Sequence, residues 1–216
     1  RKGMCYVTGQ QQPVANQHPA KIRNSADKAR LISSNDDSGY TFRGRFTTAD
    51  EACGVSFEVT QKAHNALRWL IERQGYRDGD MAVVAWAVSG ADIPDPMADT
   101  FALALGGAPE APAQTAGYTA QEIGVQFSKR VAGYTAELGD TTDVVVMALD
   151  SATPGRMAIS FYRELTGSEL LTRVQAWHTG CCWPQYFGKG RVFDGAPSPR
   201  DIAQAAYGSR LDGKLR

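Results

Sequence analysis

Lysine and arginine alternate with aromatic and small polar residues near the N-terminus of this 216-residue chain. Lysine and arginine bind phosphates, asparagine and serine bond base edges, and tyrosine stacks on unpaired bases. Residues 21–46 therefore predict a nucleic-acid contact, with a solvated surface loop as the alternative. The candidate residues are Lys21, Arg23, Lys28, Arg30, Asn35, Ser38, Tyr40, Arg43 and Arg45.

A second candidate is the polar face of a helix that is expected to begin at Thr48. A row of side chains on this face can reach a phosphate or a base. The alternative is an ordinary solvated face, because Glu58–Lys62 and Arg68–Glu72 have the i, i+4 spacing of surface ion pairs. The row comprises Lys62, Asn65, Arg68 and Trp69.

A third stretch that mixes aromatic and basic residues lies near the C-terminus. For this stretch, structural packing of the aromatic rings is the favoured interpretation, and we do not count it as a predicted binding site. Its residues are Trp183, Tyr186, Phe187, Lys189 and Arg191.

Metal-binding and catalytic patterns are weak in this sequence. The four cysteines include no C-x-x-C pair, which favours reduced thiols in a cytosolic protein over a disulfide framework. No G-x-S-x-G, H-E-x-x-H, P-loop or Rossmann glycine motif is present. We therefore predict no metal, no cofactor and no catalytic residue. Zinc ligands would have to come from Cys5, His18, His178, Cys181 and Cys182, whose adjacent cysteines make a poor knuckle.

Composition is that of a soluble globular protein, with 43% hydrophobic and 21% charged residues. No apolar run approaches the roughly 20 residues that a membrane helix needs. The net charge is zero, but residues 1–50 hold eight basic and four acidic residues, residues 51–150 hold six and fourteen, and residues 151–216 hold nine and five. Basic ends favour nucleic-acid contact at the ends only, and uneven surface charge without a role is the alternative.

The periodicity of the first half predicts a long amphipathic helix from Thr48, capped by Thr48 and Glu51. Gly75 suits a left-handed stop, and residues 76–80 supply a turn. Met81–Val88 is a continuous apolar run, typical of a strand covered on both faces. The apolar face of the helix is expected at Val59, Ala63, Ala66, Leu67 and Leu70.

Local signals place further elements. Capping-box spacing at Thr119–Glu122 and Thr166–Glu169 starts two helices, and Ser198-Pro199-x-Asp201 starts a last one. A β-hairpin is expected over 142–163, with its turn at 151–155. Shorter elements are expected at Met4–Thr8 and Ala29–Ser33 as strands and at 98–105 as a helix.

These elements predict an α+β fold, with helices packed on a small, mostly antiparallel or mixed sheet and with long loops. All segments are expected to belong to one larger domain of a longer protein. They are a basic loop-rich segment with short strands (1–47), a long helix plus buried strand (48–88), a flexible linker or insertion (89–117), and a helix, hairpin, helix and C-terminal loop and helix (118–216).

Several stretches of the chain look like parts of one protein family. They are Gln-Lys-Ala-His-Asn-Ala-Leu-Arg-Trp-Leu-Ile (61–71), Met-Ala-Val-Val-Ala-Trp-Ala (81–87), Leu-Ile-Ser-Ser-Asn-Asp-Asp-Ser-Gly-Tyr (31–40), Cys-Tyr-Val-Thr-Gly (5–9) and Ala-Pro-Ser-Pro-Arg-Asp-Ile-Ala-Gln-Ala-Ala-Tyr-Gly (196–208). Together they resemble the large-subunit protein of type I-C CRISPR effector complexes (type I-C Cascade, the Csd family). Members of that family are much longer, so the chain is expected to be a middle fragment.

The resemblance implies a non-catalytic, cytoplasmic, DNA- and RNA-binding large subunit in antiviral defence. Its implied partners are CRISPR guide RNA, target DNA, other subunits of the effector complex and a recruited helicase-nuclease, with no membrane. Such a subunit helps recognise the short motif beside the target and holds the opened DNA. Two alternatives come from other classes: a metal-dependent nuclease that uses Asp27, Asp36 and Asp37, and a purely structural protein–protein module.

Overall fold

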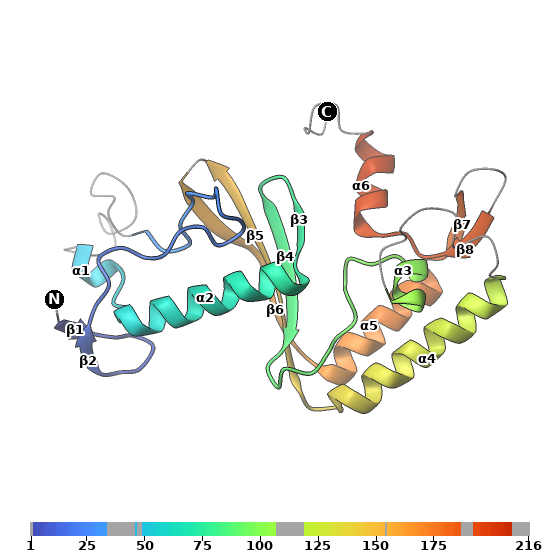
Figure 1. Cartoon of the computed structure of the whole chain (residues 1–216), viewed down its shortest axis with the longest axis horizontal. Helices are drawn as coiled ribbons and strands as arrows, with labels where there is room; N and C mark the ends of the chain where they lie inside the picture. Colours follow the sequence, from blue (N-terminus) through green and yellow to red (C-terminus); the bar gives the residue numbers. More distant parts are fainter. Residues whose placement is uncertain are drawn as a thin grey trace. The chain divides into compact units, whose positions relative to one another are not determined.

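The computed structural model describes residues 2–33, 46, 49–106, 119–153, 155–186 and 192–208. The chain divides into two compact units, and each unit is built from two separate segments. Unit 1 comprises Arg1–Val84 and Met147–Tyr162, and unit 2 comprises Ala85–Val146 and Arg163–Arg216. Figure 1 labels the helices and strands along the chain.

Unit 1 begins with a small hairpin in which β1 (Lys2–Met4) pairs antiparallel with β2 (Gln11–Pro13). The strand predicted at Met4–Thr8 is wrong beyond Met4, because the chain turns after Cys5. The Gly9 N–H closes this turn by donating to the Cys5 carbonyl at 2.8 Å.

The long helix predicted from Thr48 is in fact two helices, α1 (Ala49–Ala52) and α2 (Phe57–Gln74). Ser56 caps α2, because its side chain accepts a hydrogen bond from the Val59 N–H at 3.2 Å. The predicted cap at Thr48 lies outside the described residues.

The break between α1 and α2 comes from backbone pairing with the N-terminal segment. The Tyr6 N–H donates to the Gly54 carbonyl at 2.7 Å, and the Ala15 N–H donates to the Val55 carbonyl at 3.0 Å. A Cβ on Gly54 would lie 2.6 Å from the Met4 carbonyl oxygen, so this close approach needs glycine. The chain is therefore extended here because of contacts with residues that are distant in the sequence.

The buried face of α2 consists of Thr60, His64, Leu67 and Ile71. Of the predicted apolar stripe only Leu67 is buried, and Ala63 and Ala66 are exposed. The prediction counted apolar residues, but a polar side chain is buried without large loss once it is hydrogen-bonded, as the Thr60 hydroxyl and His64 Nδ1 are.

Gly75 ends α2 in an extended conformation with φ −80° and ψ 139°, so the predicted left-handed stop is wrong. Glycine is needed for space instead, because a Cβ would lie 2.6 Å from the Ile71 carbonyl oxygen. The next residues form β3 (Tyr76–Asp78), which pairs antiparallel with β4 (Met81–Ala87). The buried strand is thus confirmed, and the predicted turn shrinks to Gly79-Asp80.

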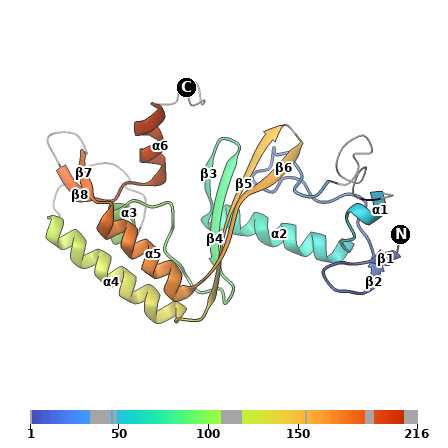
Figure 2. The same cartoon turned by 180° about the vertical axis from the view of Figure 1, so that it is seen from behind.

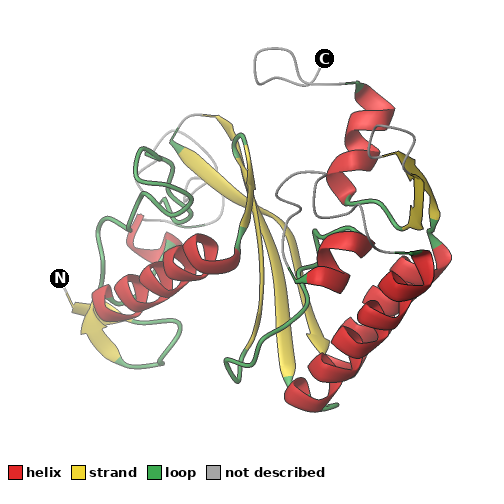
Figure 3. Ribbon diagram, turned by 45° about the vertical axis from the view of Figure 1, so that its right-hand side comes forward, coloured by secondary structure: helices red, strands yellow, loops and turns green. Residues whose placement is uncertain are grey.

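Four strands form one sheet in the order β3-β4-β5-β6, drawn in yellow in Figure 3. The neighbours β5 (Asp143–Thr153) and β6 (Arg156–Thr166) confirm the predicted hairpin, with longer strands and a shorter turn than expected. Each of β4, β5 and β6 contributes residues to both units.

Unit 2 is built on α3 (Thr100–Leu105), α4 (Ala120–Leu138) and α5 (Gly167–Gly180), with α4 and α5 side by side in Figures 1 and 2. The short helix α3 confirms the one expected over 98–105. Its apolar residues enter the core, so this part of the predicted linker is packed. The core comprises Ala87, Phe101, Leu103, Ala104, Ile123, Phe127, Leu138, Val144, Leu170 and Val174.

Helix starts in unit 2 follow the predicted caps. Thr119 and Thr166 form complete capping boxes at α4 and α5. Ser198 caps α6 (Pro199–Tyr207), whose first residue is the expected proline. These signals lie within four residues of each helix start, which is why periodicity and capping rules predict them well.

The C-terminal region contains a two-stranded antiparallel sheet where a loop was predicted. Its strands are β7 (Trp183–Tyr186) and β8 (Val192–Gly195), which are rich in the aromatic and β-branched residues that favour strands. The whole arrangement confirms an α+β fold. Within the described residues, no helix is both long and apolar enough to span a bilayer.

Candidate nucleic-acid interface

All thirteen residues predicted to contact nucleic acid belong to segments assigned to unit 1. Five of them lie outside the described residues: Asn35, Ser38, Tyr40, Arg43 and Arg45. The structure divides the other eight into a group that serves the fold and a group that faces solvent.

Arg23 serves the fold. Its side chain is buried, and its Nε and Nη2 donate to the two carboxylate oxygens of Asp27 at 2.9 and 3.0 Å. Its Nη1 also donates to the Asp80 carbonyl, at the turn between β3 and β4. Burial raises the pKa of Asp27, but the hydrogen bonds and charge of Arg23, together with the hydrogen bond from the Ala29 N–H, lower that pKa overall. Arg23 is therefore a structural cation and not an exposed phosphate ligand.

Arg68 ties the same loop to α2. Its Nε donates to the Lys21 carbonyl at 2.8 Å, and its Nη2 donates to the Ala20 carbonyl at 2.9 Å. The predicted partner Glu72 is not involved in these contacts. Lys21 has a positive φ of 61°, which is unusual for a side chain other than glycine. Arg68 thus anchors the loop, and the exposed Lys21 lies beside α2 as a result.

Arg30 and Lys28 lie at the end of this loop. The backbone of Arg30 forms a parallel bridge to Arg156 of β6, with hydrogen bonds to Gly155 and Met157. This single bridge stands where a strand was predicted at Ala29–Ser33, so that strand is wrong. The Lys28 side chain is exposed.

The remaining predicted residues lie on one exposed stripe of α2, which we call the α2 outer face. The recurrence at steps of three and four residues places its members in one row, opposite the buried face. Its members are Glu58, Lys62, Asn65, Trp69, Glu72 and Arg73.

Two contacts organise this row. Lys62 donates to Glu58 at 2.6 Å, which confirms the predicted surface pair and lowers the pKa of Glu58. The Arg73 guanidinium carbon lies 5.1 Å from the centroid of the Trp69 ring, within the range of a cation–π contact. Trp69 is nevertheless 54% exposed, so most of its indole faces water.

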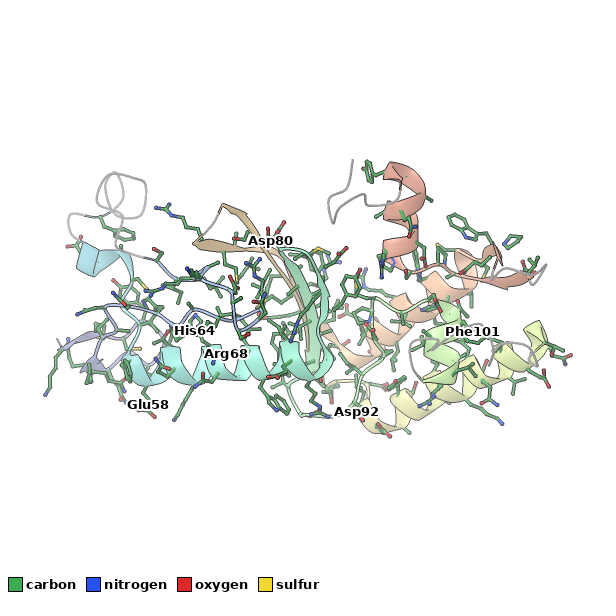
Figure 4. All side chains as sticks on the ribbon, turned by 45° about the horizontal axis from the view of Figure 1, so that its top comes forward. Glu58, His64, Arg68, Asp80, Asp92 and Phe101 are labelled. Atoms are coloured by element: carbon green, nitrogen blue, oxygen red, sulfur yellow. The ribbon has the colours of Figure 1, made fainter. Side chains whose placement is uncertain are left out.

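Behind this face lies a buried polar network that the sequence reasoning missed. The Thr60 hydroxyl is 2.9 Å from His18 Nδ1 and 3.1 Å from His64 Nδ1. His64 Nδ1 is also 2.7 Å from the Thr60 carbonyl, which only accepts, so this nitrogen carries the proton. In Figure 4 His64 points from α2 toward the N-terminal segment, whereas Glu58 points away from it.

The same network leaves one imidazole nitrogen without a hydrogen bond. His64 Nε2 is buried and is the one such side-chain atom within the described part of the chain. His18 Nε2 lies 3.7 Å from the Cys53 sulfur. Burial, followed by the nearby His64 and Arg30, lowers the pKa of His18. The network therefore fixes the N-terminal segment on α2 through the bond between His18 and Thr60, and burial favours the neutral form of His18.

Comparison with protein-family models identifies the family of this chain. The family model described as CRISPR-associated protein (Cas_Csd1) matches residues 1–216. The chain belongs to this family. It is therefore a CRISPR-associated protein, and the family consists of effector-complex subunits that act with other Cas proteins. No curated protein matches the sequence.

Another buried polar cluster among the described residues surrounds His178. In unit 2, the Thr100 hydroxyl lies 2.8 Å from His178 Nδ1 and accepts the Ala196 N–H at 2.8 Å. All four cysteines carry free thiols. Among the described residues, no group of three or more His, Cys, Asp or Glu side chains is arranged to hold a metal.

Proposed function

We propose that this chain is a non-catalytic, nucleic-acid-binding part of the large subunit of a type I-C CRISPR surveillance complex. Its role is to help recognise the motif that flanks the target and to hold target DNA during antiviral defence. Membership of the Cas_Csd1 family supports the CRISPR role, and the quoted sequence stretches support the subtype. The proposed partners are guide RNA, target DNA, neighbouring subunits and a recruited helicase-nuclease, all in the cytoplasm.

The observation that carries this proposal is the row on the α2 outer face beside Lys21. Lys62 supplies a cation, Asn65 supplies an amide that can bond a base edge, and Trp69 supplies an exposed ring. Arg68 links this row to the basic loop, because it donates to the Lys21 carbonyl. Phosphate, base-edge and stacking chemistry thus lie next to one another on unit 1.

The absence of catalysis is part of the proposal. The alternative nuclease needs Asp27 as a magnesium ligand, but both oxygens of that carboxylate accept hydrogen bonds from Arg23. Its other two residues, Asp36 and Asp37, lie outside the described residues. We expect no Mg²⁺-dependent cleavage when the purified chain is incubated with single- or double-stranded DNA. Cleavage that EDTA abolishes would favour the nuclease.

Binding across a salt series tests the proposal. We expect the full chain to bind a fluorescein-labelled DNA oligonucleotide, with an affinity that falls as salt rises. The triple variant Lys21→Ala/Lys62→Ala/Trp69→Ala should bind at least about ten-fold more weakly, since stacking alone supplies about 1–3 kcal/mol per base. Fluorescence anisotropy provides the measurement.

The control is a double variant in unit 2, Lys129→Ala/Trp183→Ala. Lys129 is exposed, and Trp183 is 48% exposed, which matches Trp69 closely. The control should bind like the wild-type chain. Loss of binding in the control and not in the triple variant would move the contact to unit 2. A folded wild-type chain that binds no nucleic acid would leave the structural protein–protein module as the better account.

A further inference from the structure

We propose that Trp69 is a stacking platform for an unpaired base, so that the α2 outer face takes single-stranded nucleic acid and discriminates against duplex. This inference rests on the proposed function and deepens it by naming the form of nucleic acid. It draws on the exposure of the indole, on the charge balance of the outer face and on the order of side chains along α2.

A stacking platform must expose an aromatic ring to solvent, and Trp69 does so. It is 54% exposed, although it lies within an 18-residue helix whose opposite face is buried. Arg73, one turn further along, places its guanidinium carbon 5.1 Å from the ring centroid. A cation at this distance favours a fixed ring orientation and complements the electron-rich face of the ring. A base within a duplex has both of its faces stacked, so only an unpaired base can use such a ring.

The charge balance of the outer face argues against duplex as the ligand. Glu58 and Glu72 offset Lys62 and Arg73, and Lys62 already bonds Glu58 at 2.6 Å. Duplex binding without base readout depends on several cations that replace the counterions of the phosphates. The guanidinium of Arg68 keeps its charge, but its Nε and Nη2 donate to two backbone carbonyls, so fewer of its N–H groups can bond a phosphate. Stacking is the stronger attraction that this face offers.

The order of side chains along α2 fits a short unpaired strand. Lys62, Asn65 and Trp69 follow one another at steps of three and four residues. A rise of 1.5 Å per residue spreads them over about 10 Å. The exposed Lys62 ammonium has three N–H donors, so it can bond a phosphate while it bonds Glu58. A phosphate ligand, a base-edge ligand and a ring surface therefore stand in line. Arg23, whose guanidinium is buried, takes no part in this binding.

The test compares dT12 and rU12 with a DNA duplex of the same length, each labelled with fluorescein, on the full chain. We expect the wild-type chain to bind one or both single strands more tightly than the duplex. Trp69→Ala should weaken single-strand binding by about 5- to 100-fold. Trp69→Phe, which keeps a ring, should stay within about three-fold of wild type, and so should Trp183→Ala. The two single strands tell displaced DNA from guide RNA as the source.

The outcomes separate this inference from the proposed function. If the chain binds nucleic acid but Trp69→Ala has no effect, or duplex binds as tightly as single strands, the stacking platform is wrong and the proposed function stands. If the wild-type chain binds no probe, both fail. Trp69 is exposed, so its variants should keep the wild-type melting temperature, and circular dichroism shows whether they do.

Discussion

The Arg23 guanidinium and the Asp27 carboxylate are buried together, and their two hydrogen bonds measure 2.9 and 3.0 Å. Both ions have lost most of their hydration, and they replace it with each other and with the Asp80 carbonyl. Such a pair adds little net stability over apolar residues of similar size, but it is costly to break. Removal of one partner leaves the other charged and unpaired in the interior.

Arg23→Ala should therefore destabilise the fold by about 3–5 kcal/mol, because Asp27 loses its partner while it stays buried. Urea denaturation monitored by circular dichroism measures the change. Lys28→Ala, an exposed cation in the same loop, should stay within about 0.5 kcal/mol of wild type. If Arg23→Ala were as stable as wild type yet failed to bind nucleic acid, Arg23 would be a ligand after all.

His178 is a second residue whose environment has a measurable consequence. Burial lowers its pKa from 6.5 to about 4, and its Nδ1 is 2.8 Å from the Thr100 hydroxyl. The folded chain therefore keeps this imidazole neutral under conditions in which the unfolded chain protonates it. The unfolded state then binds more protons, so stability falls as pH is lowered.

We expect the His178 contribution to be fully present above about pH 6.5 and to be lost progressively as pH falls from 6.5 to about 4. The total loss should be about 3 kcal/mol, since each unit of pKa shift corresponds to about 1.4 kcal/mol. Urea denaturation at a series of pH values gives the curve. His178→Gln should flatten this curve, with a residual slope from His18, whose pKa is also lowered. An equally steep curve in the variant would contradict the assignment.

At the scale of elements, Gly75 and Gly133 differ in whether their surroundings leave room for a side chain. Gly75 sits where a Cβ would lie 2.6 Å from the Ile71 carbonyl oxygen and 2.8 Å from the Ile71 Cα. Gly133, inside α4, has open space where its Cβ would be. Sequence alone treats both as helix-related glycines, and only the first is required by its surroundings.

Gly75→Ala should destabilise the chain, because the added Cβ meets backbone atoms that can move only if α2 distorts. Gly133→Ala should stabilise it by about 0.5–1 kcal/mol, since alanine favours the helix and narrows the unfolded ensemble. Melting temperatures of the two variants, measured side by side, check both signs. Equal effects of the two substitutions would show that close packing at Gly75 is unimportant.

An element is predictable from the sequence when the contacts that define its ends are made by residues close to it in the chain. Thr119 and Thr166 cap their helices by bonds to residues three positions on, so the sequence predicts both starts. The start of α2 at Ser56 depends instead on hydrogen bonds from Tyr6 and Ala15, more than 30 residues away. No local pattern around Thr48 contains that information.

The same reasoning applies to the candidate interface. Of the row predicted on α2, Lys62, Asn65 and Trp69 are exposed on one side, as helical period predicts. Arg68 departs from that prediction, because it is half-buried and bonds two loop carbonyls. The sequence could not tell that Arg23 is buried, because the ion pair with Asp27 requires a loop conformation that only tertiary contacts define. Charge counts mark candidates, and burial decides between binding and structural roles.

At the scale of the whole molecule, the division into units does not follow the chain. The early residues of unit 1 meet a later hairpin, as Arg30 does when its backbone bonds Gly155 and Met157. Segment boundaries drawn along the sequence describe local composition. They do not show which segments share a compact unit, because that depends on strand pairing between distant residues.

Because unit 1 consists of two separate segments of the chain, its two parts are synthesised at different times. The ribosome finishes Arg1–Val84 well before Met147–Tyr162, the second part of the same unit. At about 5–20 residues per second, the first segment waits roughly 4–16 s for the strands that complete it. During that interval the backbone groups of Arg30 lack their partners on Gly155 and Met157, so unit 1 cannot complete its fold until β6 has been synthesised.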